Sequence, residues 1–182
     1  EEYPYMITRI SDDRYIIKME NEKPYGMGVF IDIYPYDGLG TTEKEAVTYG
    51  MKGDRLSSLC YQSTREHFAI ETTTSLFRKI IKYPIFIGSK LIGKDYFQKK
   101  LNQLVELKEY EDSNYIGCIV WLSGGKKEIF LRKWFDETIM VPFEKYQFRV
   151  PKDYDEVLRH TYGDYMQLPP EKDRIGHHYF KA

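Results

Sequence analysis

The sequence predicts a single α+β domain, and three observations lead to this class. Short strand-like runs that end in turn residues lie toward both ends of the chain, whereas the helical patterns gather in its middle. The length of 182 residues suits one domain with a sizeable core, so we treat residues 1–182 as one unit. No internal repeat and no low-complexity tract occurs, which excludes a repeat architecture.

Composition excludes several classes of protein. The 27 basic and 28 acidic residues give a formal net charge of −1, which argues against a whole-surface grip on nucleic acid. No run of about 18 apolar residues lacks charge, so no transmembrane helix is expected. Cys60 and Cys118 form no CxxC pair, which indicates neither a zinc cluster nor a disulfide-stapled secreted protein. A cytoplasmic location is therefore expected.

The first part of the chain predicts strands. Residues 5–20 are expected to form a hairpin, because strand-like residues flank the turn-forming Ser11-Asp12-Asp13. Residues 29–34 (VFIDIY) predict a buried strand that ends at Pro35.

The middle of the chain predicts helices. Residues 41–71 are expected to be helical, and Thr42 before two glutamates indicates their start. Residues 95–110 form a clean amphipathic pattern that Asp95 is expected to cap.

Residues 76–93 (LFRKIIKYPIFIGSKLIG) are apolar with interspersed cations. Between Glu71 and Asp95 the chain holds five basic residues and no acidic one. Two interpretations fit this segment equally. It is either a helix of the core or an interfacial element that makes peripheral membrane contact through anionic head groups. Pro84 argues against one continuous helix.

The last third predicts strands followed by one short helix. Residues 115–122 are strongly strand-like, and residues 138–143 and 146–150 predict a hairpin. A helix from about residue 153 to 160 follows, and the tail beyond it is irregular and rich in Pro, Gly and charge.

Asp32 is the residue with the clearest chemical signal. It lies among Phe30, Ile31, Ile33 and Tyr34, where a buried ionised carboxylate must be paired or must bind a cation. The pattern alone favours an exposed or salt-bridged aspartate. The functional reading is a strand that directs an oxygen ligand at a divalent ion.

Two stretches, in this order and spacing, resemble the LicD family. They are GMGVFIDIYPYDGL at residues 26–39 and FEKYQFRVPKDYDEVLRHTYGDYMQLPPEKDRIGHH at residues 143–178. The LicD family includes bacterial phosphocholine transferases and the fukutin-related proteins. The resemblance implies a nucleotidyltransferase-like fold, in which a mixed, largely antiparallel sheet is flanked by helices.

The resemblance also implies an activity. LicD-type proteins transfer a phospho-alcohol, most often phosphocholine from CDP-choline, to a sugar hydroxyl of a cell-surface glycan or its lipid-linked precursor. CDP-ribitol and CDP-glycerol are variant donors. The resemblance assigns Asp32 as a metal ligand for Mg²⁺ or Mn²⁺ and as a catalytic residue.

In the family, an aspartate pair in a segment like WDDDID accompanies a third aspartate, which Asp32 matches. The present sequence has no WDDDID-like segment. One aspartate cannot hold a divalent ion tightly. We therefore expect that the chain begins after the Asp-rich motif and that the 182 residues alone are inactive.

Further candidates for substrate binding lie after the second strand and in the tail. Asp37 is one of them, although the following Gly38 favours a turn. Tyr162 and Asp164 flank a glycine that would permit a tight turn, and Arg174 and His177 could contact donor phosphates. A structural clasp across the sheet is the alternative for the tail. A cation–π box for choline could draw on five aromatic residues, namely Tyr34, Tyr36, Trp121, Trp134 and Tyr162.

Two other classes of function compete with the transferase. A LicD-like domain without a metal site could recognise a glycan or a partner enzyme and catalyse nothing. A nucleotide-binding protein without a glycan role is less favoured, because no GxxxxGKS phosphate loop occurs; Gly124-Gly125-Lys126-Lys127 is too short and predicts a turn.

Overall fold

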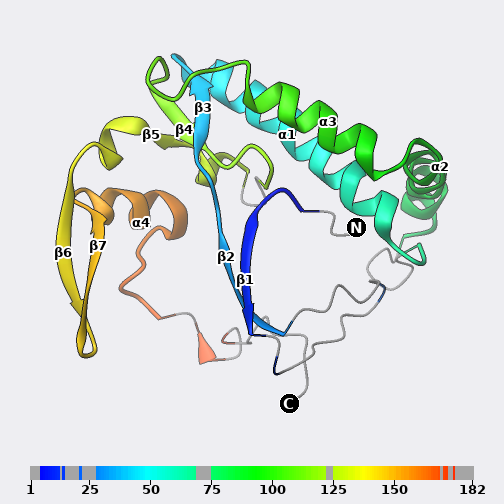
Figure 1. Ribbon diagram of the computed structural model, residues 1–182. Coiled ribbons are helices and arrows are strands. Elements are labelled where there is room, and N and C mark those ends of the chain that lie inside the picture. Colours follow the sequence, from blue (N-terminus) through cyan, green and yellow to red (C-terminus); the bar gives the residue numbers. More distant parts are fainter. Residues whose placement is uncertain are drawn as a thin grey trace.

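The protein has an α+β fold, as the sequence predicts (Figure 1). The computed structural model describes residues 5–12, 14, 21, 28–68, 75–121, 125–168, 170, 171 and 174. Within these residues the strands form three small sheets, and every strand pair is antiparallel. The single mixed sheet implied by the resemblance is therefore not what these residues form.

Two of the three sheets have two strands each, and the other has three. The first pairs β1 (Thr8–Asp12) with β2 (Val29–Ile33). The second contains β3 (Asp37–Gly40), β4 (Tyr115–Gly117) and β5 (Phe130–Leu131), with β4 in the middle. The third is the hairpin of β6 (Thr138–Phe143) and β7 (Tyr146–Pro151), which confirms the predicted hairpin.

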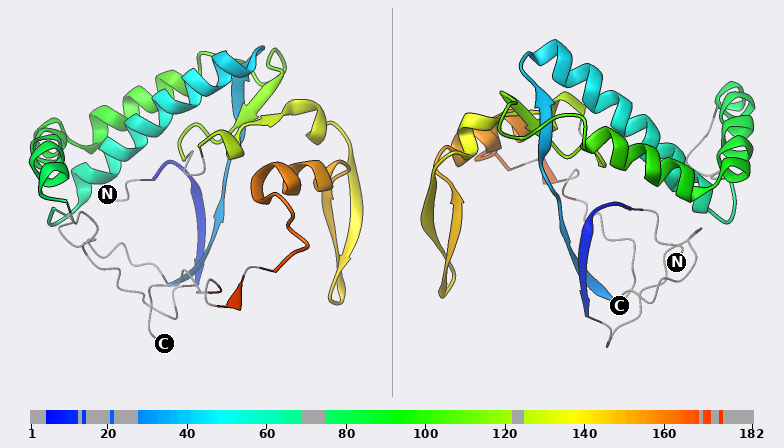
Figure 2. Two further views of the ribbon diagram at one scale, coloured as in Figure 1. Left: turned by 180° about the vertical axis from the view of Figure 1, so that it is seen from behind. Right: turned by 45° about the horizontal axis from the view of Figure 1, so that its top comes forward.

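Four α-helices and two 3₁₀ turns complete the described part of the chain. The α-helices are α1 (Glu43–Thr64), α2 (Leu76–Ile92), α3 (Lys94–Val105) and α4 (Tyr154–Tyr162). The 3₁₀ turns are η1 (Gly125–Glu128) and η2 (Arg132–Phe135). Helices α1 and α3 lie side by side, α2 lies at one end of this pair, and the β6–β7 hairpin lies at the opposite end of the molecule (Figure 2).

The core lies where α1 and α3 cover the β3–β4–β5 sheet. Leu39 from β3, Ala46 from α1 and Leu104 from α3 are buried against one another. Ile119, which follows β4, and Ile129, which precedes β5, complete this cluster. Burying such apolar surface is the main favourable contribution to folding.

Helix α1 begins where the sequence predicts and ends earlier than predicted. The Oγ1 atom of Thr42 accepts a hydrogen bond from the backbone N–H of Glu45, which is the expected N-terminal cap. The helix ends at Thr64, because Arg65 adopts an extended conformation. The predicted end at residue 71 was therefore too late, and residues 69–71 lie outside the described residues.

Three predictions for the other segments need correction. Helix α2 runs continuously through Pro84, which lies on its exposed side, where a carbonyl that loses its helical donor can bind water. Gly93, with a φ of 87°, and not Asp95, occupies the N-cap of α3. Strand β4 ends at Gly117, since the buried residues 118–120 after it are irregular.

The β1–β2 ribbon corrects two predictions, namely the hairpin of residues 5–20 and the buried strand of residues 29–34. β1 pairs with β2, and residues 15–20 lie outside the described residues. On β2 the side chains of Val29, Ile31 and Ile33 are exposed, whereas those of Phe30 and Asp32 are half-buried. A two-stranded ribbon has one face turned to solvent, and here it is the aliphatic face. In the part of the chain that the structure describes, no helix is long and apolar enough to span a membrane.

Candidate functional site

Asp32 forms an ion pair with Arg9 on the neighbouring strand. The two residues lie directly opposite each other in the antiparallel register of β1 and β2. Arg9 Nε donates to Asp32 Oδ1 at 2.5 Å, and Arg9 Nη2 donates to Oδ2 at 2.9 Å. Only 10% of the Arg9 side chain and 15% of the Asp32 side chain are exposed. Both carboxylate oxygens therefore already have a cationic partner.

Aromatic rings hold the guanidinium of Arg9 in place. Its central carbon lies 3.6 Å from the centroid of the Phe30 ring and 5.5 Å from that of Tyr5. A cation at Asp32 would have to displace this stacked and paired guanidinium. The role of Asp32 as metal ligand and catalytic residue stays a prediction from the resemblance.

Asp37 is the buried carboxylate that has an oxygen without a partner. It does not sit in a turn, because it begins β3 and pairs with Gly117 of β4. Its Oδ2 atom is buried and has no hydrogen-bond partner. Burial raises the pKa of Asp37 to about 6, and a hydrogen bond from the backbone N–H of Ile119 offsets only part of this shift.

Replacing Asp37 by asparagine is expected to stabilise the protein above pH 6 and not at pH 4. Because the pKa is higher in the folded state than the ordinary value of 3.8, folding favours the neutral acid. The stability it gives is present below about pH 4 and is lost as the pH rises through about 6. We expect Asp37→Asn to gain about 1 kcal/mol at pH 8 after allowance for solvent screening.

Urea unfolding at pH 4 and pH 8 measures this difference. Asp164→Asn, at an exposed position, is the matched control and should show no pH-dependent gain. An equal effect of Asp37→Asn at both pH values would contradict the assignment of a raised pKa.

Several ionisable groups surround Asp37. Burial raises the pKa of the Cys118 thiol to about 12, and the charge of Asp37 adds to this shift. Burial also raises the pKa of Tyr36, to which Cys118, Glu128 and Tyr162 contribute further. Tyr162, a predicted binding residue on α4, therefore interacts electrostatically with Tyr36, the residue that precedes β3.

A cavity of about 380 Å³ lies between α1, the β5 segment, η1 and α4. Its apolar part comes from Val47, Ile129 and Leu131, and Tyr115 joins them. Its remaining lining residues carry charge or a polar ring, and they are Glu43, Lys126, Lys127, Trp134 and His160. Small-molecule sites have this combination of an apolar surface with a few polar groups.

Contacts among the lining residues fix the shape of this cavity. The rings of Trp134 and His160 meet edge to face, 5.6 Å apart. The Nε2 atom of His160 lies 3.1 Å from the backbone carbonyl oxygen of Lys126, which joins α4 to η1. Phe130 packs on both His160 and Tyr36, so the aromatic residues connect the cavity to the strand before Asp37.

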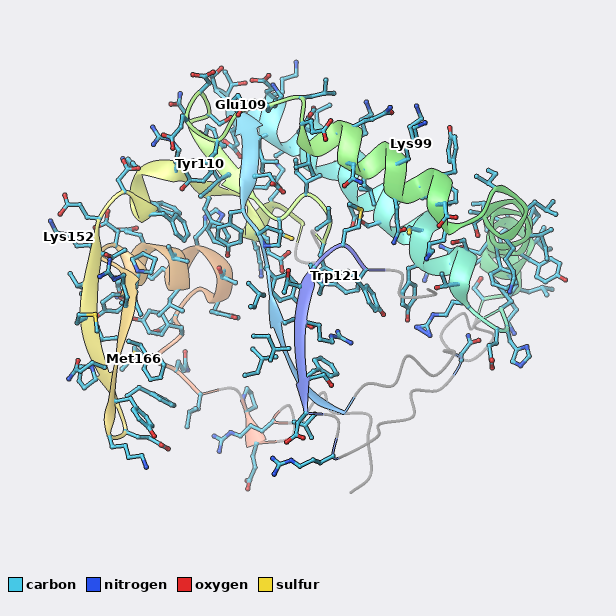
Figure 3. The ribbon with its side chains drawn as sticks, in the orientation of Figure 1. Lys99, Glu109, Tyr110, Trp121, Lys152 and Met166 are labelled. Atoms are coloured by element: carbon cyan, nitrogen blue, oxygen red, sulfur yellow. The ribbon has the colours of Figure 1, made fainter. Side chains whose placement is uncertain are left out.

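The five predicted aromatic residues do not form one box. Trp134 lines the cavity, whereas Tyr36 does not and packs on Phe130 and Phe135. Trp121 instead packs on Tyr5, 5.1 Å between ring centroids, beside the segment that leads into β1 (Figure 3). Burial raises the pKa of Tyr34, and Asp32 adds to the shift, which places Tyr34 on the side of the ion pair.

The predicted tail residues are only partly within the described residues. Gly163 has a φ of 73° and ends α4, so the expected glycine-dependent turn is confirmed. Asp164 is exposed; the hydrogen bond to Asp155 raises the pKa of Arg159, and the charge of Asp164 adds to this shift. The backbone N–H of Arg174 donates to Glu171, and His177 lies outside the described residues.

Sequence reasoning missed Arg9, Glu43, His160 and the two lysines of η1 as site residues. An arginine on a strand next to one that carries an aspartate is a signal that could have identified Arg9. The other residues come together only through the packing of α1, η1 and α4, and no spacing in the sequence reports it.

The described residues do not make up a divalent-ion site. They contain no group of three or more His, Cys, Asp or Glu side chains that could hold a metal ion. The oxygens of Asp32 are held by Arg9, and Asp37 offers a single unpartnered oxygen.

Comparison with known proteins identifies one curated relative of clear similarity. The lipopolysaccharide cholinephosphotransferase LicD of Haemophilus influenzae is 32% identical over 156 residues. The aligned region covers 85% of this chain and 56% of the Haemophilus protein, so the chain spans a little over half of that relative. No family model and no solved structure matches the chain.

The described residues form an α+β protein with a pocket between its helices and the β3–β4–β5 sheet. The chain belongs to the LicD family.

Proposed function

We propose that the protein containing this chain transfers phosphocholine from CDP-choline to a sugar hydroxyl of a lipopolysaccharide glycan or its lipid-linked precursor. The Haemophilus relative is a lipopolysaccharide cholinephosphotransferase, which supports the transferred group and the acceptor class. In the reaction, the sugar oxygen attacks the choline-bearing phosphorus and the bond from that phosphorus to the oxygen of CMP breaks. CMP leaves, and the proton of the sugar hydroxyl is released.

The cavity is the observation that carries this proposal. Phosphocholine joins a quaternary ammonium to a phosphate, and the cavity offers groups of both kinds. The lining residues include Trp134 and Tyr115, whose rings suit a cationic head group, and Glu43, whose carboxylate suits it as well. They also include Lys126 and Lys127, whose ammonium groups suit a phosphate. A glycan-only site would need no such pairing of charges.

Binding of phosphocholine to this chain tests the cavity directly. Calorimetric titration with phosphocholine is compared with titration with glycerol 3-phosphate, which has a phosphate and no ammonium. We expect Trp134→Leu to weaken phosphocholine binding about tenfold, because cation–π contacts contribute about 1–2 kcal/mol when desolvated. Binding of glycerol 3-phosphate should not change.

Trp121→Leu is the matched control, since Trp121 was an equal candidate on sequence and lies outside the cavity. It should leave phosphocholine binding unchanged, with circular dichroism reporting the fold of both variants. Equal weakening by Trp121→Leu would contradict the assignment.

Transfer itself is tested with the full-length gene product. CMP release from CDP-choline, with lipopolysaccharide as acceptor, is measured with Mg²⁺ or Mn²⁺ and with EDTA. We expect turnover with the ions and none with EDTA, and none from the 182-residue chain. CDP-ribitol and CDP-glycerol serve as alternative donors at the same concentrations.

A non-catalytic binding domain is the second candidate, and the pairing of Asp32 with Arg9 favours it. If the full-length product binds phosphocholine at the cavity and releases no CMP under any condition, the binding domain is the correct function.

A further inference from the structure

Helix α2 exposes most of its apolar side chains. Among its 17 residues only Phe86 and Ser89 are buried, and both face the rest of the protein. Leu91 is 83% exposed, Leu76 is 74% exposed and Phe77 is 72% exposed. The core-helix reading of residues 76–93 is therefore wrong. A folded protein seldom leaves so much contiguous apolar surface in water without a partner.

The exposed apolar residues occupy one continuous side of the helix. At about 100° per residue, six of them fall within roughly half of the circumference, with no charged residue between them. These are Leu76, Phe77, Ile80, Ile81, Leu91 and Ile92. We call them the α2 apolar face. Phe86 and Ser89 lie on the other side, toward α1, which α2 contacts.

Cations border this face. Arg78, Lys79, Lys82 and Lys90 all fall on the remaining arc, and α2 contains no acidic residue. Lys90 is held in place, since its Nζ donates to the backbone carbonyl of Arg65 at 2.5 Å. In the part of the chain that the structure describes, no carboxylate forms an ion pair with Arg78, Lys79 or Lys82.

Position in the fold leaves the α2 apolar face accessible. The helix lies at the end of the α1–α3 pair, away from the β6–β7 hairpin and α4 in all the views (Figure 2). Phe68, which follows α1, packs on Tyr83 and Phe86 of α2. These ring contacts hold α2 against the rest of the protein. A flat surface could approach the helix along its length without touching the cavity.

We propose that α2 docks the protein on an anionic lipid bilayer. The apolar face enters the boundary between head groups and acyl chains, and the bordering cations meet the lipid phosphates. Charge complementarity selects this occupant over a second copy of the chain, because two α2 helices would bring their cations together. The inference is independent of the phosphotransferase proposal, as it uses no residue of the cavity.

Co-sedimentation of the 182-residue chain with vesicles tests the docking. One set of vesicles is phosphatidylcholine alone, and the other contains 30 mol% phosphatidylglycerol. We expect at least tenfold tighter binding to the anionic vesicles and a loss of this preference as the salt concentration rises. Absence of binding to both sets, or equal binding to both, would overturn the proposal.

Variants locate the contact. Phe77→Asp/Leu91→Asp should reduce vesicle binding at least tenfold, and both sites are too exposed for the change to unfold the chain. Leu107→Asp is the matched control, because Leu107 is 68% exposed and follows α3. It should bind as the unmodified chain does. If light scattering shows a dimer that Phe77→Asp/Leu91→Asp dissociates while vesicle binding persists, α2 is a subunit interface and the proposal is wrong.

Discussion

Replacing Gly53 by alanine is expected to lower the free energy of unfolding by about 2–3 kcal/mol. A Cβ atom on Gly53 would lie 2.4 Å from the backbone carbonyl oxygen of Ile119 and 2.6 Å from its Cγ2 atom. Alanine inside a helix is normally favoured over glycine by about 1 kcal/mol. Here the steric conflict outweighs that gain, since helix α1 would have to move away from the segment after β4.

Gly88→Ala is the matched control within α2. Gly88 is also inside a helix, but a Cβ atom there would meet nothing within 4 Å. This variant should raise the free energy of unfolding by about 0.5–1 kcal/mol. Urea unfolding of both variants gives the two signs, and stabilisation by Gly53→Ala would show that α1 and the β4 segment do not pack as described. A change of 2–3 kcal/mol is large beside a typical total of about 5–15 kcal/mol.

Gly53 also shows where sequence reasoning stops. The pattern of residues 41–71 predicts a helix and Thr42 predicts its start, because both are local properties of the chain. The contact between Gly53 and Ile119 joins residues that are distant in sequence, and no local pattern reports it. The same holds for the shortened β4, whose residues 118–120 look like strand but are buried without strand pairing.

The candidate site divides in the same way. The sequence marks Asp32 by its strand-like surroundings and offers Asp37 as a further candidate beside the turn-forming Gly38. It ranks Asp32 above Asp37, because Gly38 suggests a turn there. The structure adds what the sequence could not show: Arg9 pairs with Asp32 across the β1–β2 register, and the Oδ2 atom of Asp37 is buried without a hydrogen-bond partner. Which side chain pairs with a carboxylate depends on how the strands pair. A resemblance to a family motif gives no information on strand pairing.

The largest effect on the proposed activity is expected from Asp32→Asn. A second change at Arg9 separates a catalytic role of Asp32 from a purely structural one. Breaking a mostly buried ion pair by changing one member is strongly destabilising, so Asp32→Asn and Arg9→Met should each lower the free energy of unfolding by about 3 kcal/mol. In the double variant Arg9→Met/Asp32→Asn no charge is left unpaired, and stability should return to within about 1 kcal/mol of the unmodified chain.

Transfer activity of the full-length product then distinguishes a catalytic from a structural carboxylate. If Asp32 acts on the substrate or on its ion, Asp32→Asn abolishes CMP release, and the double variant stays inactive although it is stable again. We expect this result, because a carboxylate's charge cannot be replaced by restored packing. Recovery of turnover together with stability would mean that Asp32 serves only to hold Arg9 and β1 in place, and the search for the acidic group of the reaction would move to Asp37.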